Sequence, residues 1–228
     1  GLGQNSTVPH SSPIQISGAG WSKSHCGYFE TLSIKNDNTL WAWGLNDKGQ
    51  LGVNNTTNYS SPVQIPGTTW SKVGTGNNSV FTTKTDGTLW VWGYGAWGGI
   101  LGQNNNTEYS SPVQIPGTTW AQASMSLYSS WATKTDGTLW AWGNNQSGLL
   151  CQNNTISYSS PVQIGGGTDW SVVDGGHGTF MAKKTDNTLW MAGSNNQGQL
   201  GNNTAGNPTQ ISSPVQIPGT TWNNICSG

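Results

Sequence analysis

The side chains that most often perform chemistry are few in this chain, and their spacing does not assemble a catalytic or metal site. The three histidines do not occupy equivalent positions of the repeat that recurs in this chain: His10, His25 and His177. The cysteines lack the spacing of metal ligands, and we expect buried free thiols: Cys26, Cys151 and Cys226. A hydrolase needs at least two titratable groups in mutual register, and a metal site needs clustered ligands. The sequence therefore predicts a protein that is not an enzyme and that holds no metal and no cofactor.

Aspartate is the exception, because four aspartates recur at intervals of about 50 residues: Asp37, Asp86, Asp136 and Asp186. Each begins an Asp-Gly or Asp-Asn pair between alternating apolar flanks, as at Asp86-Gly87. Because Gly and Asn tolerate positive φ and Asp can hydrogen-bond its own backbone, these pairs predict tight hairpin turns. A calcium loop would need an Asp-x-Asp-x-Asp array, which does not accompany them. We interpret the four aspartates as structural.

Tryptophan follows each turn in the pattern Leu-Trp-x-Trp or its variant Leu-Trp-Met-Ala. In a β-strand, Trp90 and Trp92 lie on one face while Leu89 and Val91 lie on the other. Because aromatic side chains favour a pleated, half-buried surface, we interpret these tryptophans as a packing layer between neighbouring sheets. The set consists of Trp41, Trp43, Trp90, Trp92, Trp140, Trp142 and Trp190.

A fixed period of this kind indicates stacked copies of one supersecondary unit. Each copy offers four short strands, as in 70–73, 79–84, 89–92 and 112–115, and the last begins at a proline that suits a sheet edge. Four-stranded antiparallel units with glycine-rich connections predict an all-β fold, a β-propeller. The chain is predicted to be one repeat domain with a partial repeat at 1–20, full repeats at 21–69, 70–119, 120–169 and 170–221, and a partial repeat at 222–228.

The combined motif is Asp-Gly-Thr-Leu-Trp-x-Trp-Gly, then Asn-x-x-Gly-x-Leu-Gly, then Ser-Pro-Val-Gln-Ile. It resembles the repeat of the regulator of chromosome condensation (RCC) family, especially its bacterial and phage members, over essentially the whole chain. The resemblance implies a seven-bladed ring of which these residues form a part. The alternative is an open ring completed by another chain, as a homo-oligomer or through a donated strand.

Charge is scarce, at 7% of residues with a formal net charge of −1, and every basic residue is lysine. Because arginine is the usual bidentate ligand of phosphate and guanine, we do not expect nucleic-acid binding. The chain has no apolar run long enough to span a bilayer, so membrane insertion is not expected. Its wealth of Asn, Ser, Thr and Gly suits an exported protein or the surface of a virion.

The repeats differ mainly in their loops, where several aromatic residues lie. Trp and Tyr dominate the hot spots of interfaces, so aromatic residues on variable loops indicate a contact surface. The candidate binding residues are Tyr28, Phe29, Tyr94, Trp97, Tyr128, Trp131 and His177. Tyr94 and Trp97 are the strongest candidates, because glycine-rich loops seldom bury such rings. Neutral drift or local packing would explain the same residues equally well.

Three functions fit these observations. The first is a non-catalytic binding or structural propeller that presents loop aromatics to a protein or glycan partner. The second is inhibition of an enzyme by a secreted protein, which the resemblance implies because the family includes a secreted inhibitor of β-lactamase. The third is guanine-nucleotide exchange or chromatin association, as in the nuclear member of the family. The missing arginine counts against the third.

Overall fold

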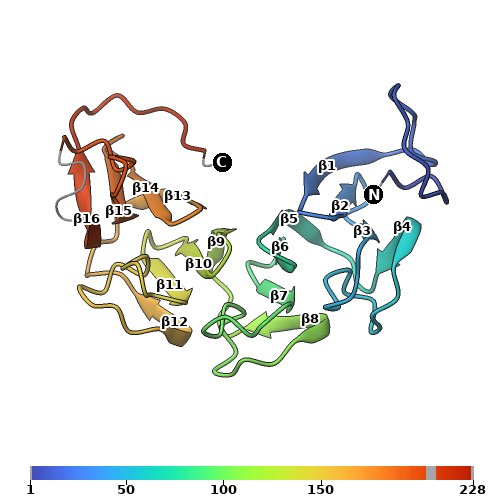
Figure 1. Cartoon of the computed structure of the whole chain (residues 1–228), viewed down its shortest axis with the longest axis horizontal. Coiled ribbons are helices and arrows are strands. Elements are labelled where there is room, and N and C mark those ends of the chain that lie inside the picture. The colour runs from blue at the N-terminus through green and yellow to red at the C-terminus, as the bar shows by residue number, and fades with distance from the viewer. Residues whose placement is uncertain (1, 204–208, 227–228) are drawn as a thin grey trace. The chain divides into compact units, whose positions relative to one another are not determined.

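The computed structural model describes residues 2–203 and 209–226, and its regular elements are all β-strands (Figure 1). The strands form four antiparallel sheets of four, each in simple chain order. The predicted all-β propeller fold is therefore confirmed at the level of its blades. The chain divides into two compact units. Unit 1 comprises the chain up to Tyr94 together with Glu108–Thr118, and unit 2 comprises Gly95–Thr107 and the chain from Thr119 onward.

Each sheet begins at the tryptophan that opens a predicted repeat. The strands of unit 1 are β1 (Trp21–Cys26), β2 (Glu30–Lys35), β3 (Leu40–Gly44), β4 (Tyr59–Ile65), β5 (Trp70–Thr75), β6 (Ser79–Lys84), β7 (Leu89–Gly93) and β8 (Tyr109–Ile115). The strands of unit 2 are β9 (Trp120–Met125), β10 (Ser129–Lys134), β11 (Leu139–Gly143), β12 (Tyr158–Gln163), β13 (Trp170–Gly176), β14 (Thr179–Lys184), β15 (Leu189–Ser194) and β16 (Gln210–Ile217). Residues 1, 204–208 and 227–228 of the predicted repeats lie outside the described residues.

The hairpin between β6 and β7 shows how the repeated turn is built. Gly87 N donates to Lys84 O at 3.1 Å, and Lys84 N donates to Thr88 O at 3.0 Å. Gly87 has a φ of 78°, and Asn38 and Asn187 occupy the same left-handed region in their own turns. A turn of this type needs one residue at positive φ, which explains why Gly or Asn follows each aspartate.

The aspartate of each turn starts a short relay of hydrogen bonds. In unit 1, Asp86 Oδ1 accepts from Thr88 Oγ1 at 2.7 Å, and Thr88 Oγ1 accepts from Trp90 Nε1 at 2.8 Å. The same relay joins Asp37 to Trp41, Asp136 to Trp140 and Asp186 to Trp190. These hydrogen bonds hold the pKa of each aspartate below its usual value, with the neighbouring threonine as the main cause.

The fourth strand of each blade is longer than the sequence predicts. We expected a start at the proline, but β8 begins at Tyr109, and Pro112 lies inside it. The register between β7 and β8 shifts between Val91 and Gly93, where the ladder is irregular. A bulge on an outer strand accommodates a residue that cannot donate to the ladder, so the proline does not end the strand.

The two tryptophans of each pair have different environments. The second of each pair is buried, and Trp92 donates from Nε1 to Gln50 O of the preceding repeat at 2.9 Å. The first tryptophan of each pair is half-buried beneath a lysine: Lys84 Nζ lies 4.3 Å from the ring centre of Trp90. The same Lys84 Nζ lies 4.5 Å from the ring centre of Trp70, which opens the blade. The buried tryptophan therefore packs between sheets, whereas its partner closes the surface through a cation–π contact.

Candidate functional site

The loop after the third strand of a blade is normally held by a buried asparagine. Asn46 donates from Nδ2 to Asn55 O and to Thr57 O, both at 2.9 Å, and its Oδ1 accepts from Leu51 N at 2.8 Å. Asn145 and Asn195 are buried at the equivalent positions. One amide side chain thus satisfies several backbone groups at once and fixes the loop.

The second repeat replaces this asparagine with Gly95 and lengthens the loop by one residue. A Cβ on Gly95 would lie 2.1 Å from Thr107 O, so the backbone occupies the space that the asparagine side chain fills elsewhere. The extra length leaves Trp97 exposed over 45% of its surface. The loss of the asparagine and the one-residue insertion are the signals in the sequence that mark this loop as different.

Trp97 packs against Tyr128 from the loop between β9 and β10, within unit 2. Their ring centres are 5.0 Å apart and the rings are tilted by 50°. Asn144 lies next to both loops: its backbone N donates to Tyr128 O at 2.8 Å, and a Cβ on Gly98 would lie 2.9 Å from the same nitrogen. Trp97, Tyr128 and Asn144 therefore form one continuous surface, which we call the Trp97 surface. Sequence reasoning identified its two aromatic residues but missed Asn144.

The loop between β1 and β2 carries a second exposed aromatic pair, in unit 1. Tyr28 is 73% exposed and Phe29 is 61% exposed, with their ring centres 5.0 Å apart. Beneath them, Glu30 is buried, and its Oε1 has no hydrogen-bond partner among the described residues. Burial raises the pKa of Glu30, and the nearby Asp47 carboxylate raises it further. In the next two blades a serine takes this position and donates to a loop carbonyl, as Ser79 does to Tyr94 O.

The remaining candidates lie apart from these two pairs. Tyr94 is half-buried in unit 1, where Lys48 Nζ lies 5.5 Å from its ring centre and 3.3 Å from Glu108 Oε1. His177 is exposed after β13. The prediction was wrong for Trp131, which has no exposed surface. It packs against Phe180, with the ring centres 5.9 Å apart, and belongs to the core of unit 2.

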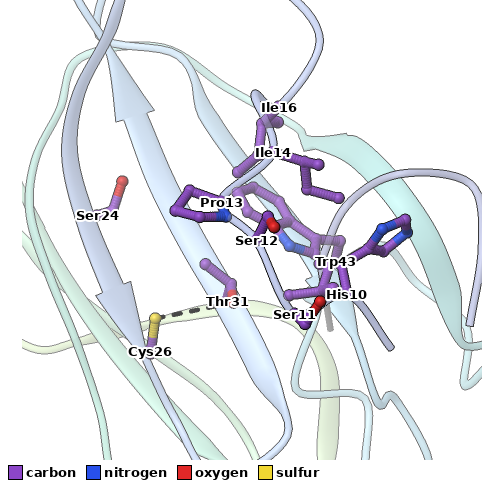
Figure 2. A pocket seen from close by; sticks show the side chains of 11 residues that line it. His10, Ser11, Ser12, Pro13, Ile14, Ile16, Ser24, Cys26, Thr31 and Trp43 are labelled. Carbon is purple, nitrogen blue, oxygen red and sulfur yellow. Dashed lines mark hydrogen bonds between the residues drawn. The ribbon is translucent and has the colours of Figure 1, made fainter. Parts of the chain in front are cut away.

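A cavity of about 560 Å³ lies in unit 1 between the N-terminal segment and the first sheet (Figure 2). Its wall is largely apolar, with Pro13, Ile14 and Trp43 among the lining residues. Cys26 also lines it and accepts a weak hydrogen bond from Thr31 Oγ1 at 3.9 Å. Covalent catalysis needs a base beside its nucleophile, and no hydrogen bond joins Cys26 to a histidine in the described part of the chain.

The cysteines do not share one environment. Cys151 is buried, and burial raises its pKa, but Cys26 and Cys226 are exposed, contrary to the expectation of buried thiols. Cys26 ends β1, whose residues after Trp21 are all exposed, and Cys226 lies outside the described strands. Across residues 2–203 and 209–226 no three His, Cys, Asp or Glu side chains cluster as metal ligands. The described segments also contain no helix with the length and hydropathy of a membrane span.

The fold matches solved structures over most of this chain. Human WBSCR16 shares 21% identity at a TM-score of 0.78, covering 93% of this chain and 57% of that protein. Prp20p from Saccharomyces cerevisiae, studied for its binding to Gsp1p and histones, shares 15% identity at a TM-score of 0.78. The match covers 92% of this chain and 53% of that protein. Yeast RCC1 (Prp20) bound to Kap60 shares 20% identity at a TM-score of 0.76, covering 90% of this chain and 51% of that protein. The chain thus spans about half of the length of these structures.

Sequence comparison points to the same repeat. No curated protein sequence matches the chain. The family model for the regulator of chromosome condensation (RCC1) repeat matches residues 37–82 and 136–182. Each match starts at a turn aspartate and runs through the tryptophan-bearing strand into the next blade. The chain therefore contains two segments that match the regulator of chromosome condensation (RCC1) repeat, and its blades have the β-propeller fold of the solved structures that it resembles.

Proposed function

We propose that this protein is a non-catalytic binding propeller that holds a macromolecular partner through the Trp97 surface. The observation that carries the proposal is the exposed indole of Trp97 on a loop that departs from the other three repeats. A large aromatic side chain that stays exposed on a well-defined loop is typical of an interface anchor. Its rigid position lowers the entropy lost on binding.

The partner is a protein or a glycan, and no nucleic acid is expected because the chain has no arginine. Prp20p binds proteins, which supports a protein partner only by likeness of fold. The low charge and the abundance of Asn, Ser and Thr support an exported or virion-surface location of the bacterial or phage type. An oligomer, or completion of the propeller by another chain, is compatible with either partner.

Enzyme inhibition is a second candidate, and the Tyr28–Phe29 pair favours it. Two rings exposed over more than half of their surface at the tip of one hairpin have the shape of a plug for an apolar pocket. Guanine-nucleotide exchange or chromatin association has no comparable support from the residues of this chain. Replacement of Tyr28 and Phe29 by alanine separates the plug from the Trp97 surface experimentally.

The test compares wild-type protein with Trp97→Ala as bait in extracts and culture supernatant of the source organism. Trp222→Ala is the matched control, because it also removes an exposed indole. Trp222 lies away from the Trp97 surface, since its backbone N donates to Asn187 O in the turn between β14 and β15. We expect a partner that wild type and Trp222→Ala retain and that Trp97→Ala loses. Equal retention of every captured component by Trp97→Ala would refute the proposal.

A further inference from the structure

Unused hydrogen-bonding groups lie on Asn144, which belongs to the Trp97 surface, and on Gln146, which follows it in the same loop. Asn144 Oδ1 accepts from Gln146 N at 3.0 Å, but the Asn144 amide nitrogen donates to no group among the described residues. The Gln146 side chain is exposed and likewise makes no hydrogen bond within the part of the chain that the structure describes. Amide donors and acceptors at the edge of an aromatic ring match the hydroxyl groups around the rim of a sugar ring, whose C–H face packs on aromatic side chains.

No residue of the Trp97 surface carries a formal charge, and neither does Gln146. In unit 2 the hairpin charges lie at the opposite strand ends: Lys134, Asp136, Lys183, Lys184 and Asp186. Asp174 on β13 is engaged with its own neighbours, because its Oδ1 accepts from Ser124 Oγ at 2.8 Å and from Gly175 N at 3.0 Å. A charged ligand would therefore gain little here, and a neutral polar ligand would lose little.

The size of the surface suits a small ligand better than a folded protein. A stable protein interface buries about 800 Å² per partner around an apolar core. The Trp97 surface offers one exposed ring, a half-buried tyrosine and the Asn144 amide, with the exposed amide of Gln146 in the same loop as Asn144.

The ring is also held in place before any ligand binds. Gly98 and Gly99 have φ values of 66° and 77°, and a Cβ on Gly99 would lie 2.3 Å from Ser159 Cβ. Ile100 O, directly after them, accepts from Trp142 Nε1 and from Ser130 Oγ, both at 2.8 Å. Tyr128 then supports the indole from the side. A fixed ring loses little entropy when it binds, which a weak ligand requires.

We propose that the Trp97 surface binds a neutral glycan, with a sugar ring packed on Trp97 and its hydroxyls bonded to Asn144 and Gln146. The inference rests on the proposed function and adds the class of partner. Tyr128 braces Trp97 and lies at the edge of the site. Binding through one ring and two amides is weak, so high avidity would come from repeated sugar units that engage several copies of the protein.

The experiment titrates the protein with neutral oligosaccharides of glucose, galactose, mannose and N-acetylglucosamine, using saturation-transfer NMR and calorimetry. We expect at least one to bind with a dissociation constant of about 1 mM or lower, without marked dependence on salt. Trp97→Ala should weaken that binding at least about tenfold, and Trp97→Phe should restore part of it. Gln146→Ala should weaken it a few-fold, and Trp222→Ala should leave it unchanged.

Two results would overturn the glycan assignment. One is that no neutral oligosaccharide in the panel shows Trp97-dependent binding. The other is a clear preference for sulfated or uronic-acid oligosaccharides that disappears at high salt. If either occurs while a captured protein still requires Trp97, the partner is a protein and the proposed function stands. If neither glycan nor captured protein depends on Trp97, both proposals fail.

Discussion

Trp131 donates from Nε1 to Leu149 O at 3.0 Å, and this carbonyl is the one that the repeat pattern assigns to a different tryptophan. The equivalent carbonyls, Gln50 O and Ile100 O, accept from Trp92 and Trp142 of the following blade. In the fourth blade the residue equivalent to Trp92 and Trp142 is Ala192, which has no indole to donate to Leu149 O. Trp131 reaches across from β10 and supplies an indole to the same acceptor. One blade thus compensates for a residue lost from its neighbour.

This compensation predicts strong coupling between positions 131 and 192. Trp131→Ala should lower the free energy of unfolding by about 3–5 kcal/mol, because it opens a cavity and leaves Leu149 O without its indole donor. Ala192→Trp alone should also destabilise the protein, because Trp131 already fills the space. The double variant Trp131→Leu with Ala192→Trp restores the pattern of the first two blades and should recover stability.

Chemical denaturation of wild type, Trp131→Leu, Ala192→Trp and the double variant completes a double-mutant cycle that measures the coupling. Trp222→Ala serves as the control for the loss of an indole that is exposed. Additive effects at positions 131 and 192 would contradict the compensation.

The loop that carries Trp97 should tolerate no side chain at Gly99. Its φ of 77° is costly for other residues, and the new Cβ would meet Ser159. Gly99→Ala should lower the free energy of unfolding by about 1–3 kcal/mol. Gly166→Ala is the matched control, because a Cβ there has no neighbour within 4 Å, and its effect should stay within about 0.5 kcal/mol. Equal effects in thermal or chemical denaturation would show that the loop is not under this constraint.

The turn aspartates predict a loss of stability in acid. Because the folded-state pKa of Asp136 lies below its ordinary value of 3.8, the stabilisation is present above pH 3.8 and is lost as pH falls through the folded-state pKa. Thr138→Val removes the main cause, so it should raise the pKa of Asp136 towards 3.8. An NMR titration of the carboxyl carbon measures this shift.

Thr135→Val in the same turn is the control, because no side-chain hydrogen bond joins Thr135 to Asp136 among the described residues. A pKa of Asp136 that is unaltered in Thr138→Val would exclude the hydroxyl as its cause.

Glu30 predicts the opposite dependence on pH. Its folded-state pKa lies above the ordinary value of 4.5 because the carboxyl is buried, so stability falls as pH rises through that folded-state pKa. Glu30→Gln keeps the shape without the charge and should stabilise the protein at pH 7 by about 1 kcal/mol or more. The difference from wild type should shrink below pH 4.5.

Urea denaturation of both proteins at pH 4 and pH 7 measures this difference. Glu108→Gln is the control, since the Glu108 side chain is 40% exposed and paired with Lys48. A benefit of Glu30→Gln that is equal at both pH values would point to packing and not to ionisation.

Local sequence determined the hairpins of this protein and their period. An Asp-Gly or Asp-Asn pair between alternating apolar residues specifies its turn through backbone sterics and side-chain hydrogen bonds a few residues away. For the same reason the sequence identified β6 and β7 closely but placed the start of β8 too late, since a bulge depends on the neighbouring strand.

Tertiary structure decided which aromatic residues are available to a partner. Trp97 and Trp131 look alike in the sequence, as extra aromatics at variable positions of the repeat. Trp131 is buried because the fourth blade lacks a tryptophan and leaves room for it, whereas Trp97 is exposed because Gly95 replaces the asparagine that holds the other loops. Ala192 belongs to another blade than Trp131, and Gly95 acts through its close approach to Thr107 O. Burial is a property of what surrounds a side chain, and only the folded arrangement brings those surroundings together.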